Sequence, residues 1–105
     1  MTDRELLELA AKAAGIELWH EDVFTNGLTH KVSDNGVLCW NPLTDDGDAL
    51  RLAVKLLFEI DMDRRSIAIR HQTGVKILRA FNNDPYAATR RAIVRAAAEI
   101  GRSMK

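Results

Sequence analysis

Histidine, cysteine and acidic side chains are the residues of this chain whose types could ligate a metal ion. His20 and Asp22 would share one face of an extended segment. His30, His71 and Cys39 lie elsewhere, without the short spacing of a structural zinc site. His30 and His71 also fall in phase with apolar residues, which is typical of packed histidines satisfied by hydrogen bonds. We therefore expect no metal site and no cofactor.

The acidic run Asp45, Asp46 and Asp48 has the composition of a calcium loop or of a catalytic pair of carboxylates. A calcium loop needs alternating ligands and a distant glutamate, and this segment has neither. The same carboxylates could accept hydrogen bonds from the first amides of a helix and favour the positive end of its dipole. We interpret them as capping residues.

The sequence does not indicate a catalytic nucleophile. Cys39 lies within an apolar segment and has no assignable general base. An activated Ser or Cys needs both a positioned base and an oxyanion hole. The chain also has no glycine-rich phosphate loop. We therefore expect a protein that is not an enzyme.

Capping signals predict helices at both ends of the chain. Thr2 and Glu5 form a capping box before a helix over 3–14. Asp84 is the expected N-cap of the last helix, with Pro85 at its first position. The expected buried stripe of that helix is Tyr86, Ile93, Ala97, Ile100 and Met104. Its expected close-packing edge is Ala88, Ala92 and Ala96.

Between these helices the pattern predicts antiparallel strands on both sides of a third helix. The expected strands are 17–24, 28–32, 37–40, 66–71 and 75–81, separated by turn residues such as Asn26-Gly27. The helix over 49–60 is apolar around most of its circumference, which predicts the hub of the core or part of a subunit interface. The sequence thus predicts one domain, 1–105. Its fold class is an α/β (α+β) sandwich of order α-β-β-β-α-β-β-α, with antiparallel strands packed against three helices.

Charge is divided between the two parts of the chain, although the net charge is zero. Residues 1–63 carry 13 Asp or Glu against 5 Lys or Arg, whereas residues 64–105 carry 2 against 10. Opposite charges of this size could attract a charged protein, nucleic acid or a second copy of the chain. A closed homodimer is expected if the two charged parts lie on different faces. If they adjoin within one monomer, they neutralise each other instead.

Two segments resemble a known family of small bacteriophage and prophage proteins, the phage "ABA sandwich" family. Residues 40–53 (Trp-Asn-Pro-Leu-Thr-Asp-Asp-Gly-Asp-Ala-Leu-Arg-Leu-Ala) resemble its central signature. Residues 88–101 look like its C-terminal helix, and 5–15 fit its opening. The resemblance implies a phage origin, hence the cytoplasm of a bacterial host, and a layered α/β fold. It implies no activity and no catalytic residues.

These observations favour a non-catalytic accessory or modulator that binds a phage or host protein and has no contact with a membrane. The alternative is nucleic-acid binding through the basic second part. The order α-β-β-β-α is similar to a double-stranded-RNA-binding domain, but an acidic run replaces the basic start of its second helix. A further alternative is capture of a small charged ligand near that helix start. The candidate interaction surface consists of Arg90, Arg91, Arg95, Arg102, Trp40, Asn41, Asp45 and Asp46.

Overall fold

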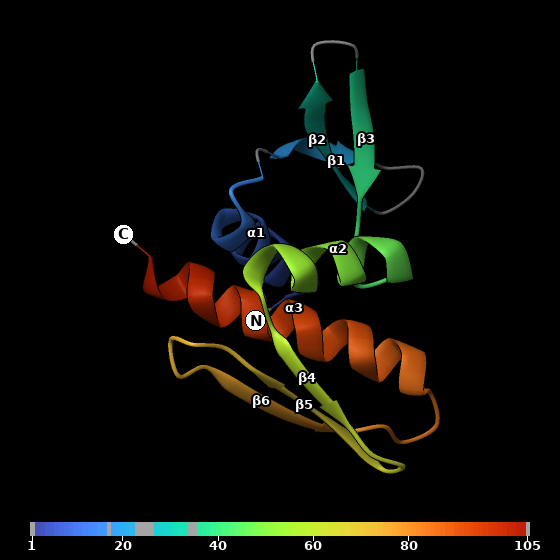
Figure 1. Cartoon of the computed structure of the whole chain (residues 1–105). Coiled ribbons are helices and arrows are strands. Elements are labelled where there is room, and N and C mark those ends of the chain that lie inside the picture. Colours follow the sequence, from blue (N-terminus) through green and yellow to red (C-terminus); the bar gives the residue numbers. More distant parts are fainter. Residues whose placement is uncertain (1, 17, 23–26, 34–35, 105) are drawn as a thin grey trace.

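The chain alternates three helices with two groups of antiparallel strands (Figure 1). The computed structural model describes residues 2–16, 18–22, 27–33 and 36–104, with backbone positions alone for 18–22, 27–33 and 36–39. The described elements are α1 (Asp3–Ala14), β1 (Leu18–Asp22), β2 (Gly27–Ser33), β3 (Gly36–Trp40), α2 (Asp46–Leu56), β4 (Glu59–Met62), β5 (Ser66–Arg70), β6 (Lys76–Ala80) and α3 (Pro85–Ser103). The mixed α+β class is confirmed.

Helix α3 lies between the second sheet and the other two helices. The sheet β4-β5-β6 covers one side of α3, and α1 and α2 cover the other; the sheet β1-β2-β3 lies beyond α1 and α2 (Figure 1). The completely buried residues of α3 are Ala92, Val94, Ala96 and Ala97. Ile67 and Ile69 on β5 are equally buried and meet α3 from the sheet. The hub of the core is therefore α3, and the prediction that the middle helix occupies this place is wrong.

Small residues allow α1 and α3 to pack very closely. Ala10, Ala11 and Ala14 of α1 are buried, as are the predicted close-packing alanines of α3. Gly101 lies against the backbone of Leu9, so that a Cβ atom there would overlap the Leu9 carbonyl oxygen. Because glycine and alanine have little or no side chain, the backbones of α1 and α3 lie closer together than larger side chains would permit.

The predicted caps of the helices are present. The Thr2 hydroxyl accepts a hydrogen bond from the Glu5 amide (3.1 Å) and donates to the Glu5 carboxylate (3.1 Å). At the other end of α1, Gly15 adopts φ 71°, and the Ile16 amide returns to the Ala11 carbonyl (2.9 Å). This pattern satisfies carbonyls that the last turn would otherwise leave unpaired.

The middle helix ends earlier than expected, and a strand follows it. The sequence predicted a helix to residue 60, but α2 ends at Leu56 because Leu57 takes the left-handed conformation (φ 57°). The Phe58 amide then reaches back to the Ala53 carbonyl (3.0 Å). The turn places Phe58 edge-on to the His71 ring and directs residues 59–62 along β5. The order of elements therefore differs from the expected one by strand β4.

The second sheet is a regular antiparallel meander. Ile60 pairs with Ile69 and Met62 with Ile67, so these four side chains share the face toward α3. The strands β5 and β6 correspond to the predicted hairpin and are slightly shorter than expected. Among the described residues, no helix combines the length and hydropathy needed to cross a bilayer.

We expect Gly101→Ala to lower the free energy of unfolding by about 1–3 kcal/mol, because the added methyl group forces α1 away from α3. Chemical denaturation measures the change. Gly47→Ala is the matched control, since its new Cβ would meet only the mobile end of Arg51 and the Asp45 carboxylate. This control should change stability by less than about 1 kcal/mol. Equal effects would contradict the close contact at Gly101.

Leu57→Gly should stabilise the protein by about 1 kcal/mol, because glycine removes the cost of a left-handed residue. The side chain of Leu57 is 78% exposed, so little burial is lost. Thermal and chemical denaturation report the gain. Asn82→Gly is the control: Asn82 is also left-handed (φ 56°), but asparagine tolerates this conformation. A loss of stability in Leu57→Gly would contradict this interpretation of the α2 end.

Candidate functional site

Helix α2 presents large apolar side chains to solvent. Its inner face is buried through Ala49, Leu52 and Ala53, whereas Leu50 and Val54 are 60% and 63% exposed. The described residues of the chain itself therefore cover only one face of this helix, and the alternative predicted from the sequence, a subunit interface, stays a prediction. Single exposed leucines are common on proteins, but a continuous exposed apolar area indicates an interaction surface.

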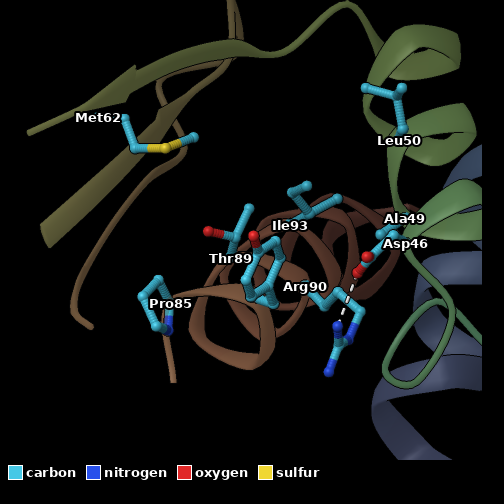
Figure 2. A pocket seen from close by; sticks show the side chains of 9 residues that line it. Asp46, Ala49, Leu50, Met62, Pro85, Thr89, Arg90 and Ile93 are labelled. Atoms are coloured by element: carbon cyan, nitrogen blue, oxygen red, sulfur yellow. Dashed lines mark hydrogen bonds and ion pairs between the residues drawn. The ribbon is translucent and has the colours of Figure 1, made fainter. Parts of the chain in front are cut away.

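A groove of about 510 Å³ lies between α2, β4 and the start of α3 (Figure 2). We call it the α2–β4–α3 groove. It is lined by Asp46, Ala49, Leu50, Met62, Pro85, Tyr86, Thr89, Arg90 and Ile93. In Figure 2, Leu50 on α2 faces Met62 on β4 across the groove, and Ile93 and Thr89 lie on α3 between them. Its size is that of a ligand or peptide site, and its walls are mostly apolar.

An ion pair between α2 and α3 lies on the lining of the groove. Arg90 donates from Nη1 to Oδ1 of Asp46 (2.6 Å, dashed in Figure 2) and from Nε to the carbonyl oxygen of Leu43 (2.9 Å). The Arg90 side chain is only 18% exposed. A mostly buried guanidinium that donates to two acceptors has a structural role, because it holds the two acceptors in place. It fixes the start of α2 on α3.

Strand β4 forms the opposite wall and is exposed along its whole length. Helix α3 packs mainly on β5 and β6, so β4 extends beyond the covered part of the sheet. Met62 is 56% exposed and faces the groove. Tyr86, at the start of α3, is 71% exposed, which corrects its expected place in the buried stripe. Met104 of the same stripe is also exposed and Ile100 is half-buried, whereas Ile93 and Ala97 are buried as expected.

A hydrogen-bonded turn holds β4 against β5. Oδ1 of Asp63 accepts from the amides of Arg65 (2.7 Å) and Ser66 (2.8 Å). These bonds favour the ionised carboxylate and lower the pKa of Asp63 below its ordinary value of 3.8. The turn fixes where β4 ends and therefore where the groove wall ends.

Most arginines of the candidate interaction surface are paired within the chain. Arg91 lies 3.1 Å from Asp3 on α1, and Arg102 lies 3.7 Å from Glu99. Arg95 makes no ion pair with any described residue. Arg91, Arg95 and Arg102 border a small depression of about 180 Å³ that also contains Glu99.

These ion pairs join the acidic and basic parts of the chain. Arg90 and Arg91 of α3 reach Asp46 and Asp3, both from the acidic first part. The condition for charge-driven pairing of two copies was that the two parts lie on different faces. In this structure the acidic and basic parts adjoin within one monomer at these pairs, which is the alternative to charge-driven pairing that the sequence left open.

The Trp40-Asn41 part of the candidate surface supports the fold. Trp40 is buried, so it does not contribute to an exposed surface. The Asn41 amide donates to Oδ2 of Asp48 (3.0 Å), and the Asn41 side-chain oxygen accepts from the Leu43 amide (3.0 Å). Asp45 caps α2 by accepting from the Asp48 amide (2.8 Å). These residues prepare the start of α2, as predicted for the carboxylates.

Metal ligation gains no support from the described residues. Within the described part of the chain, no group of three His, Cys, Asp or Glu side chains lies close enough to hold a metal ion. Nδ1 of His71 accepts from the Thr73 amide (3.2 Å), as expected of a satisfied histidine. The side chains of His20, Asp22, His30 and Cys39 lie outside the described residues.

Comparisons of this chain with protein-family models, curated proteins and solved structures give no match.

The groove could not be recognised from the sequence, because its lining residues are also typical of a core. Leu50, Met62 and Tyr86 are apolar or aromatic, and nothing in their spacing distinguishes an exposed from a buried stripe. The one available signal was the excess of apolar residues on α2, more than one buried face requires. The candidate surface included only Arg90 and Asp46 of the groove lining.

We expect Leu50→Lys to change the free energy of unfolding by less than about 1 kcal/mol, because the side chain is already exposed. Leu52→Ala, on the buried face of the same helix, should cost about 2–5 kcal/mol. Chemical denaturation compares the two variants. A large loss in Leu50→Lys would mean that Leu50 is required for folding and would remove it from the groove surface.

Proposed function

We propose that this protein is a non-catalytic accessory or modulator factor that binds another protein through the α2–β4–α3 groove. The proposal rests on one observation, namely that exposed apolar side chains from three elements lie around one groove. Leu50, Met62 and Tyr86 are each more than half exposed and all line it. Exposed apolar area of this kind has a solvation cost that a binding partner removes.

The phage or prophage context, and with it the cytoplasm of a bacterial host, is part of the proposal. It rests on the resemblance of residues 40–53 and 88–101. The structure adds a physical role for the first of these segments, because Asn41 and Asp45 organise the start of α2. That start carries Asp46, which is tied to Arg90 in the groove lining.

Nucleic-acid binding is the less favoured function. Arg90, Arg91 and Arg102 each lie within 4 Å of a carboxylate, so binding phosphates would require breaking internal pairs. A small charged ligand near the start of α2 is also less favoured. The groove does lie there, but its lining is mostly apolar and its two charged groups already pair with each other.

The experiment places a photo-reactive phenylalanine analogue at Tyr86 and, in a control protein, at Leu78. These side chains are equally exposed, at 71% and 70%, but Leu78 lies on β6 and does not line the groove. After irradiation in a lysate of a phage-infected bacterial host, the Tyr86 variant should form a discrete protein adduct that mass spectrometry identifies. The Leu78 variant should not form it.

Competition by unlabelled protein tests whether the adduct is specific. Wild-type protein should suppress the adduct, and the Leu50→Lys variant should suppress it less. Adducts of equal yield from both positions, or none from Tyr86, would contradict binding through the groove.

A further inference from the structure

The free edge of β4 has backbone groups available for another strand. The amide of Asp63 donates to the carbonyl of Ser66 (3.0 Å), which sets the alternation of bonds in the β4–β5 pair. In this alternation Asp61 and Glu59 bond to β5, while Ile60 and Met62 direct their N–H and C=O groups away from it. No strand among the described residues pairs with that side of β4. An unpaired edge of this kind is a template for strand addition.

The α2–β4–α3 groove lies where the side chains of an added strand would go. A neighbouring strand lies about 4.8 Å from β4 in the plane of the sheet. Side chains that share the face of Ile60 and Met62 would then point toward α3, into the space bounded by Leu50 and Ile93. Apolar residues fit these positions because the groove lining is mostly apolar.

The other face of β4 is acidic. Glu59 and Asp61 alternate with the groove-facing residues, and both lie 3.5 Å from the single guanidinium of Arg70. One positive charge shared by two carboxylates leaves an excess negative charge at this edge. A residue opposite either carboxylate on an added strand is favoured when it is Lys or Arg, because opposite charges on facing strand positions attract.

We propose that the partner supplies an extended segment of alternating basic and apolar residues, which adds to the free edge of β4 as a fourth strand. This proposal rests on the proposed function, because it names the chemistry of the partner at the same groove. Backbone hydrogen bonds to Ile60 and Met62 provide affinity, and the alternation provides specificity.

Charge disfavours a second copy of β4 as the occupant. If the two copies keep their helices on the same side, residues of the same face oppose each other, so carboxylates such as Asp61 meet carboxylates. If the copies are flipped, Asp61 opposes Ile60 and an apolar side chain faces a charge. A basic and apolar segment has neither conflict.

The test uses three synthetic peptides with the wild-type protein at physiological salt. One alternates Lys with Val or Ile, the second has Glu in place of Lys, and the third has the composition of the first in shuffled order. The alternating basic peptide should bind at least about tenfold more tightly than the other two, as measured by fluorescence anisotropy. Its binding should slow hydrogen exchange at the amides of Ile60 and Met62, and leave Leu78 on the opposite sheet edge unchanged.

Two variants separate strand addition from simple charge attraction. Ile60→Pro removes an outward N–H that the β4–β5 pair does not use, so proline is compatible with this edge position. Ile60→Pro should weaken binding of the basic peptide about tenfold or more, whereas Ile60→Ala, which keeps the N–H, should weaken its binding less. Replacing Glu59 and Asp61 together by Lys should reverse the preference to the acidic peptide.

Equal binding of the alternating and shuffled peptides would overturn strand addition, and so would equal affinities of Ile60→Pro and Ile60→Ala in variants that remain folded. If the alternating peptide fails to bind while Tyr86 still forms its specific adduct, the partner uses the groove without adding a strand. In that case this inference is wrong and the proposed function stands. If both experiments fail, both are wrong.

Discussion

The close packing of α1 on α3 is the contact on which the rest of the structure depends. Gly101 and the buried alanines let the two backbones approach, so that α1 covers one side of α3. The opposite side of α3 meets β5 and β6, where Ile67 and Ile69 complete the core. One helix cannot cover three strands as well as it covers two, so β4 extends beyond it. The groove is a consequence of this geometry.

Helix ends and antiparallel pairing were accessible to sequence reasoning because they depend on local chemistry. The caps at Thr2, Asp45 and Gly15 need only a side-chain oxygen or a residue that accepts positive φ, and the sequence shows both. The end of α2 was not accessible. Leu57 has no local preference for the left-handed conformation, and the Phe58–His71 contact that follows the turn joins residues that the sequence does not show to be neighbours. Without that turn, β4 could not be anticipated.

The candidate site was predicted only in part, because composition reports charge and hydrophobicity but not exposure. Arg90 and Asp46 were identified, yet as members of a charged surface, whereas they form a partly covered tie in the groove lining. Trp40 was assigned to the surface and is buried, and Tyr86 was assigned to the core and is exposed. In both cases the burial of an aromatic residue was mispredicted, because burial depends on tertiary packing.

The division of charge along the chain has a different consequence in the folded protein from the one that composition suggests. Exposed ion pairs such as Arg91–Asp3 contribute at most about 1 kcal/mol each, so they orient the helices more than they stabilise them. By pairing internally, they also weaken the long-range attraction that the two parts of the chain would exert. In the proposed complex, apolar area and free backbone groups then provide most of the binding energy at this surface. In the same proposal, the carboxylates left in excess on β4 select among partners, since they favour a basic strand and oppose an acidic one.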